Sequence, residues 1–277
     1  MPAIENHRSS KTAKVLLLGD SGSGKTGACI SLAAAGYNLR YIDFDNGLAL
    51  VRNLTSGASA SYPPDVAKRI MFQTFTNKMK NVGGKLVPGT ANAWNRAVKN
   101  IEHWQEFEPS GEPGVAPKLL VDLGPLTSWT PEDVLVIDSL SFAAIAAFNN
   151  ILAMNNRLGQ RAEQGDWFSA QQLVEGLLAK LYEDEIKCNV VVCAHINYRT
   201  GDDKVTRGQV ESLGKALSPK VGRYFNDTIK TQTIAGKRSI VTVSDNEVEL
   251  KSSAPNSIKP RYPIETGLAD YFKAIKS

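Results

Sequence analysis

The sequence has few cysteines and no long hydrophobic run. Three cysteines among 277 residues are an odd count in a long chain, so we expect no disulfide framework and a reducing, intracellular location. No apolar stretch approaches the length of a membrane-spanning helix. The polar start MPAIENHRSSKTAK, followed only by VLLL, is not typical of a secretory signal. We therefore expect no membrane partner.

Glycine and proline, at 22 and 13 residues, are too few for a collagen-like or proline-rich rod. Hydrophobic residues make up 42% of the chain, which excludes a disordered protein because that much apolar surface can form a core. At roughly 150 residues per domain, the length predicts one to two domains. The net charge of +4 permits contact with nucleic acid but does not require it.

Short apolar runs alternate with amphipathic stretches along the chain. This alternation predicts an α/β fold with a central, mostly parallel sheet flanked by helices. The predicted strands cover 14–19, 39–44, 69–75, 133–138 and 189–195, and the predicted helices cover 25–35, 91–105, 139–158 and 169–186. Three late segments, 227–235, 239–245 and 247–252, predict an antiparallel extension at the C-terminal end of the sheet.

The pattern predicts one domain over residues 14–277, preceded by a flexible N-terminal tail at residues 1–13. Residues 107–132 are rich in proline and glycine, which predicts an irregular insertion.

The segment GDSGSGKT matches the pattern G-x-x-x-x-G-K-[ST], with a predicted strand before it and a predicted helix after it. Its glycines let the backbone wrap around a phosphate, and the loop amides then form an anion-binding nest. We expect Lys25 to reach the β- and γ-phosphates of a nucleotide and Thr26 to bind Mg²⁺. The alternative is an ordinary glycine-rich turn. The predicted binding residues are Gly19, Asp20, Ser21, Gly22, Ser23, Gly24, Lys25, Thr26 and Gly27.

Acidic residues follow two of the predicted strands. Asp138 ends DVLVID, where an ionised carboxylate needs a cation or hydrogen bonds, so we expect it to bind the metal with Ser139 assisting. Its alternative role is to cap the next helix. Asp43 and Asp45 in IDFDNG share a face, and one of them could activate the attacking water as general base. We favour Asp45, with Asp43 or a solvated turn as the alternatives.

His195 closes the predicted strand NVVVCAH, where it could contact the γ-phosphate and report its presence. The alternative is a histidine with a purely structural role. Cys188 and Cys193 lie nearby and raise the question of zinc, but no fourth ligand is close in sequence, and structural zinc takes four.

Taken in order, these segments resemble the RecA-like P-loop ATPases, and among them the ATP-binding proteins of bacteriophages that assist single-strand annealing and recombination. The resemblance runs from about residue 15 to 271, through GDSGSGKT, YIDFDNG, VLVIDSL, VVVCAH and LKSSAPNSIKPRYPIETGLADYF. It implies a RecA-like fold and Mg²⁺-dependent hydrolysis of ATP to ADP and phosphate in the cytoplasm, that of a bacterial host if a phage encodes the chain. The family usually has Glu at the position of Asp45, and RecA itself has Gln at that of His195.

The resemblance also implies partners. RecA-like proteins hold DNA with two loops, which correspond here to about 154–168 and 196–222. The second is basic and interrupted by glycines, so it predicts a mobile loop able to follow a phosphate backbone, with Arg199, Lys204 and Arg207 as candidate contacts. A solvated surface loop is the alternative.

These ATPases usually form rings or filaments in which a basic residue of the neighbour completes the nucleotide site. Lys251 in LKSSAP corresponds to such a residue, and Arg261 is a weaker candidate. An exposed lysine at the end of a strand is the alternative for Lys251.

The resulting prediction is Mg²⁺-dependent ATP binding and hydrolysis, coupled to assembly on or remodelling of single-stranded DNA in phage recombination or replication. One alternative is an assembly switch with negligible turnover, because Asp45 is one methylene shorter than the usual Glu. Another is a phosphotransferase acting on a small acceptor, for which Arg199, Arg207 and Arg223 would have to form a lid.

Overall fold

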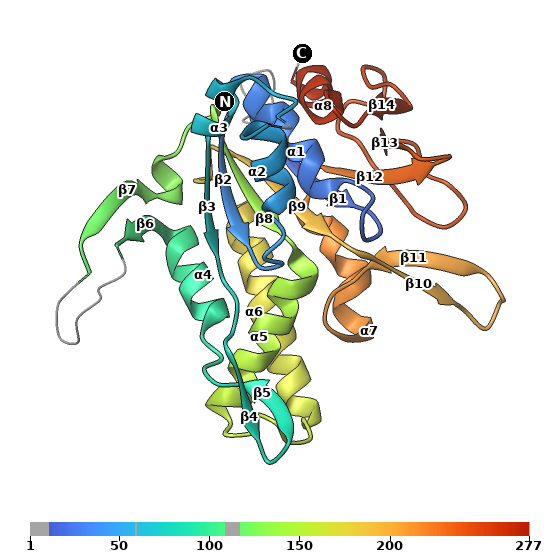
Figure 1. The fold of residues 1–277 in the computed structure, drawn as a ribbon. Coiled ribbons are helices and arrows are strands. Elements are labelled where there is room, and N and C mark those ends of the chain that lie inside the picture. The colour runs from blue at the N-terminus through green and yellow to red at the C-terminus, as the bar shows by residue number, and fades with distance from the viewer. Residues whose placement is uncertain (1–10, 59, 109–116, 277) are drawn as a thin grey trace, which may run out of the picture.

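The computed structural model describes residues 11–58, 60–108 and 117–276. Its centre is an eight-stranded sheet with helices on both faces (Figure 1). Across the sheet the strands are β14 (Arg261–Pro263), β13 (Lys237–Val241), β12 (Asp227–Ile234), β1 (Lys14–Leu18), β9 (Asn189–Ala194), β8 (Asp133–Asp138), β2 (Asn38–Asp43) and β3 (Ile70–Thr74). The strands from β12 to β3 run parallel, whereas β13 and β14 add antiparallel pairs. This confirms the predicted α/β fold and its C-terminal antiparallel extension.

Both faces of the sheet are buried, as the continuous apolar strands predict. Along β1, Val15 and Leu17 belong to one hydrophobic core, and Leu16 and Leu18 belong to the other. The first core packs against α1 (Lys25–Ala34), α2 (Ala49–Thr55), α3 (Pro64–Lys68) and α8 (Gly267–Ile275). The second packs against α4 (Ala93–Glu102), α5 (Leu140–Met154) and α6 (Gln164–Tyr182).

The strand order places the functional segments side by side. β9 lies between β1 and β8, and β2 follows β8, all four parallel. Their carboxyl ends therefore meet at one edge of the sheet, where ligands bind in open α/β folds.

Within the described residues, three strand pairs stand outside the main sheet: β4 (Met79–Val82) with β5 (Lys85–Pro88), β6 (His103–Phe107) with β7 (Leu119–Pro125), and β10 (Ile196–Thr200) with β11 (Thr206–Val210). The second one corrects two predictions. α4 ends at Glu102, three residues before the predicted end, and part of the predicted irregular insertion at 107–132 is strand β7, followed by the 3₁₀ helix η3 (Leu126–Ser128). Residues 109–116 of that insertion lie outside the described part.

The segment predicted as a mobile loop at 196–222 also has regular structure. It contains the β10–β11 hairpin, α7 (Gly214–Leu217) and most of η4 (Ser218–Tyr224). The hairpin forms by pairing between its two strands. In a polar segment that contains glycine, the local sequence gives little indication of such pairing.

The start of α6 differs from the prediction because side-chain hydrogen bonds and an ion pair set it. α6 begins five residues before its predicted start, where Glu163 and Asp166 form a reciprocal cap and Arg157 pairs with Asp166. The predicted strand at 247–252 makes only a bridge between Lys251 and Thr228.

Of the predicted tail, residues 1–10 lie outside the described part, whereas Ala13 is buried. No described helix is long and apolar enough to span a membrane.

Candidate functional site

The phosphate loop between β1 and α1 requires glycine at two positions for different reasons. A Cβ on Gly19 would lie 2.2 Å from Thr231 Oγ1 and 2.4 Å from Ser23 Oγ. Gly24, at the start of α1, has a φ of +102°, which a side chain rarely tolerates. The Ser23 hydroxyl donates to the Asp20 carbonyl at 2.7 Å and also meets Thr231 Oγ1 at 2.7 Å. The loop is therefore braced by its own polar groups and by β12.

Lys25 lies across this loop. Its Nζ donates to the carbonyls of Gly19 at 2.8 Å and Asp20 at 3.0 Å, and lies 3.2 Å from His195 Nδ1. Burial lowers the pKa of Lys25, while nearby groups that include the Asp138 carboxylate act in the opposite direction. The Lys25 ammonium is thus held by carbonyl and imidazole acceptors that an anionic phosphate can replace.

Thr26 and Asp138 form a pair of hard oxygen donors. The Thr26 hydroxyl donates to Asp138 Oδ2 at 2.6 Å. The pKa of Asp138 is raised to about 6, mainly by burial and also by the charges of Asp45 and Asp43, while the Thr26 hydrogen bond opposes the shift. Mg²⁺ is commonly bound by one or two such protein oxygens together with substrate phosphates. These two residues therefore fit Mg²⁺.

The described residues contain no group of three or more His, Cys, Asp or Glu side chains arranged to hold a metal ion. Cys188 and Cys193 are buried free thiols, and burial raises the pKa of Cys188 to about 12. The zinc alternative therefore gains no support, whereas a magnesium ion shared with phosphates needs no such group.

One carboxylate oxygen of Asp45 accepts two hydrogen bonds, and the other remains accessible. Its Oδ1 accepts hydrogen bonds from both the backbone N and the Oγ of Ser139, each at 2.8 Å. Its Oδ2 lies 3.7 Å from His195 Nε2, and the Asp45 side chain is 22% exposed. The carboxylate is therefore oriented and still reachable by a water molecule.

Asp43, the alternative base, is occupied by its own turn. Its Oδ1 accepts from the amides of Asp45 at 3.1 Å and Gly47 at 3.4 Å, and its Oδ2 accepts from the Thr74 hydroxyl at 2.9 Å. Burial raises the pKa of Asp43, and the residue is only 1% exposed. These contacts favour a structural role for Asp43.

His195 sits where β9 passes into the β10–β11 hairpin. Its backbone N donates to Ser141 Oγ at 3.1 Å, its carbonyl accepts from Glu211 N at 2.8 Å, and Ser141 Oγ donates to the Glu211 carbonyl at 2.9 Å. The Phe142 ring lies edge-on to the imidazole, with ring centroids 6.3 Å apart. One serine thus joins both ends of the hairpin to α5.

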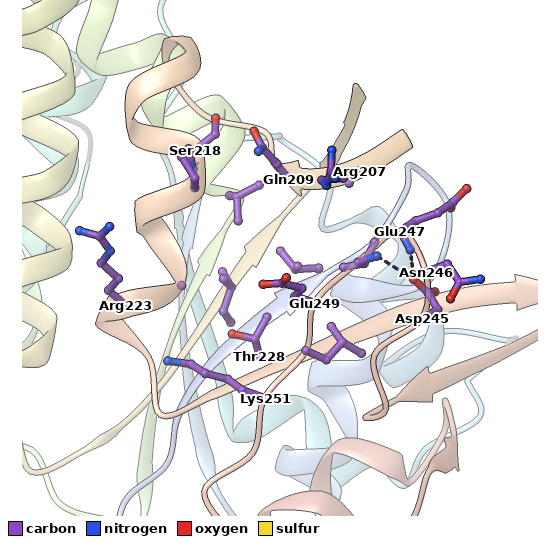
Figure 2. A pocket seen from close by; sticks show the side chains of 18 residues that line it. Arg207, Gln209, Ser218, Arg223, Thr228, Asp245, Asn246, Glu247, Glu249 and Lys251 are labelled. Carbon is purple, nitrogen blue, oxygen red and sulfur yellow. Dashed lines mark hydrogen bonds between the residues drawn. The ribbon is translucent and has the colours of Figure 1, made fainter. Parts of the chain in front are cut away.

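Lys251 and the predicted nucleic-acid residues lie elsewhere. A cavity of about 520 Å³ is lined by Lys251, Arg207 and Arg223 among others, but by none of the loop residues 19–27 (Figure 2). Burial lowers the pKa of Lys251, opposed by Asp227. Arg261 lies in β14, paired with Val241.

Two of the three arginines that the lid would need, Arg207 and Arg223, line this cavity, which no residue of the phosphate loop lines. Arg199 faces Arg207 across β10 and β11, and Arg207 Nη2 pairs with Asp203 Oδ2 at 2.7 Å, while Lys204 lies in the turn. Arg223 lies in η4. This arrangement does not favour the phosphotransferase alternative.

The structure adds two residues that the sequence did not single out, Ser141 and Arg238. Arg238 Nε donates to the Gly22 carbonyl at 3.1 Å, across 216 positions of sequence. No local pattern could have revealed such a contact. The predicted strands at 227–235 and 239–245 lie on either side of Arg238, and neither includes it.

A family model described as an AAA domain matches residues 11–253. The chain belongs to this AAA-domain family. No curated protein matches the chain. Among solved structures, the crystal structure of the RadB recombinase matches with 14% identity and a TM-score of 0.47, covering 92% of this chain and 89% of that one. The family match agrees with the phosphate loop and with the mostly parallel sheet that carries it.

Proposed function

We propose that the protein binds ATP with Mg²⁺ and hydrolyses it to ADP and phosphate. The observation that carries this proposal is the convergence of Lys25, Thr26, Asp138, Asp45 and His195 at the ends of four adjacent parallel strands. Five side chains from distant segments meet around one phosphate loop. Each has a chemistry that phosphoryl transfer to water requires.

The loop amides and Lys25 hold the phosphates in this proposal, and Thr26 and Asp138 hold Mg²⁺. A bound magnesium ion neutralises the charge that develops on the phosphates. Ser139 fixes Asp45 Oδ1, so Oδ2 is left to orient and deprotonate the attacking water. His195, within reach of both Lys25 and Asp45, contacts the γ-phosphate.

We further propose that the work done is assembly on, or remodelling of, single-stranded DNA in phage recombination or replication, in the cytoplasm of the host. The β10–β11 hairpin supports this role because it starts one residue after His195. It carries Arg199, Lys204 and Arg207 together with Tyr198, which is 40% exposed. Cations and an exposed aromatic ring are what a single strand needs for backbone contact and base stacking.

A homo-oligomer, as a ring or filament, belongs to the same proposal, with Lys251 reaching a neighbour's nucleotide. Phe142 and Ile145 on α5 are 45% and 51% exposed, and the Phe142 ring contacts His195 at the edge of the site. An apolar face beside the nucleotide is well placed for contact with another subunit.

The decisive experiment is steady-state phosphate release measured against protein concentration, with and without single-stranded DNA. A rate per molecule that rises with concentration and rises again with DNA supports the whole proposal. ATP-dependent assembly without phosphate release would favour the switch, which the short Asp45 side chain keeps open. Adding candidate small acceptors while following ADP release tests the phosphotransferase alternative.

A further inference from the structure

A second cation lies beside the phosphate loop, supplied by the C-terminal extension of the sheet. Arg238 in β13 donates through Nε to the Gly22 carbonyl at 3.1 Å. Its Cδ would lie 3.1 Å from a Cβ built on Gly24. The side chain therefore passes along the loop from Gly24 to Gly22 and ends with its guanidinium at the loop.

The antiparallel extension fixes this placement. Arg238 pairs with Thr233 on β12, and β12 runs beside β1, which leads into the loop. Ile264, directly after β14, reaches the same place, with Cγ1 3.3 Å from the Cβ position on Gly24. Arg238 of β13 and Ile264 after β14 thus form a wall of side chains beside the loop and the start of α1. Glycine at position 24 leaves room for that wall.

The charge of Arg238 is not neutralised by another residue in the described part of the chain. No described carboxylate forms an ion pair with it, and Gly22 is the hydrogen-bond partner recorded there for its guanidinium. The residue is also exposed. A guanidinium in this state retains donors on its terminal nitrogens, and its planar fork matches phosphate oxygens.

We propose that Arg238 is a second cationic ligand of the bound nucleotide's phosphates, acting from the side of the loop that β13 covers. This inference rests on the proposed ATP site and extends it. The hydrogen bond to Gly22 positions the loop, and the terminal nitrogens of the guanidinium bind phosphate oxygen. The antiparallel extension thereby contributes directly to nucleotide binding.

The test compares the affinities of Arg238→Gln and Arg238→Lys for ATP, ADP and AMP, each with Mg²⁺, by calorimetry. Loss of a charge-assisted contact predicts about tenfold weaker ATP binding for Arg238→Gln, with a smaller loss for AMP. Arg238→Lys should recover part of the ATP affinity. Lys237→Gln is the matched control because it removes the same charge from the adjacent exposed residue on the opposite side of β13. It should stay within twofold of the parent.

Two results would overturn the inference. Unchanged ATP affinity in Arg238→Gln would remove Arg238 from the site. An equal loss for all three nucleotides would mean that Arg238 only holds the loop. Lys25→Ala, measured in parallel, separates this inference from the proposed function: retained ATP binding there refutes the site as a whole, whereas lost binding there with an unaffected Arg238→Gln refutes only the role of Arg238. Thermal unfolding of each variant establishes that it is folded.

Discussion

The Nζ of Lys25 lies 3.2 Å from Nδ1 of His195. A charged lysine can only donate, so with Lys25 charged the lone pair of Nδ1 is the acceptor and the proton of the imidazole is on Nε2. Nε2 in turn faces Asp45 Oδ2 at 3.7 Å. The proposed phosphate-binding lysine, the proposed sensor and the proposed base therefore lie in one row. A phosphate that drew Lys25 away from His195 would change the partners of the imidazole.

Replacing Lys25 with Ala should abolish ATP binding. The loop would lose its buried cation, and the carbonyls of Gly19 and Asp20 would then face the phosphates without it. We expect affinity to fall by at least about 100-fold, the order of a lost charge-assisted contact in a buried site. Calorimetric titration with ATP and Mg²⁺ measures it. Micromolar affinity in the variant would contradict the site.

Asp45→Asn should leave ATP binding within a few-fold of the parent and reduce hydrolysis by about 10²–10⁴-fold, the usual contribution of a general base. The amide can still accept from Ser139 but cannot take a proton. Single-turnover phosphate release measures the loss. Asp43→Asn is the informative comparison, because its three accepted hydrogen bonds predict lower stability rather than a specific loss of turnover. Unchanged hydrolysis in Asp45→Asn would point to another base.

Asp138→Asn should stabilise the metal-free, nucleotide-free protein at pH 8. The pKa of Asp138 is raised from 3.8 to about 6, mainly by burial, so the folded protein favours the protonated carboxyl. The stability that depends on this protonated form is fully present below pH 3.8 and is lost as the pH rises through 6. At pH 8 the buried charge costs up to about 3 kcal/mol, and the amide avoids that cost.

Urea unfolding in EDTA between pH 4 and pH 8 measures this difference in the free energy of unfolding. The advantage of the variant should shrink as the pH falls through 6 and vanish near pH 4. An advantage independent of pH would show that the buried charge is not its source. With ATP and Mg²⁺ present, the parent should gain stability and the variant should gain far less.

Charge reversal at Arg199 and Arg207 should weaken binding to single-stranded DNA. Each lost phosphate contact should lower the slope of log affinity against log salt by about 0.7. Fluorescence anisotropy over a range of salt concentrations measures both effects. The same charge change at Lys80 and Lys85, exposed on the β4–β5 hairpin, is the matched control and should have little effect. DNA affinity that does not depend on salt would exclude this role for the hairpin.

The central sheet and the residues around the loop could be predicted because their signals are local. A buried strand, a glycine loop and a helix follow one another at the phosphate loop, and parallel strands bring their carboxyl ends to one edge. That rule alone places Asp45, Asp138 and His195 near Lys25. The partners that orient them come from pairings distant in sequence, which a local pattern does not contain.

The same limit explains the misplaced end of α4. The helical spacing of Trp94, Ala97 and Ile101 continues to Gln105, yet the chain leaves the helix at His103. Trp104 is then buried against Trp129, with ring centroids 5.9 Å apart. Burying the Trp104 indole against Trp129 stabilises the chain more than one further helical turn would. Trp129 is 25 positions away, so the local sequence around Trp104 does not indicate it as the partner.

The hydroxyl of Ser141 accepts from the amide of His195 and donates to the carbonyl of Glu211, so the two ends of the β10–β11 hairpin share one anchor on α5. A single hydroxyl oxygen therefore attaches both ends of the hairpin to α5, next to the His195 imidazole. Removing that oxygen would leave the two ends joined to each other by the hydrogen bond from Glu211 N to the His195 carbonyl and by the strand pairing, but without their shared attachment to α5.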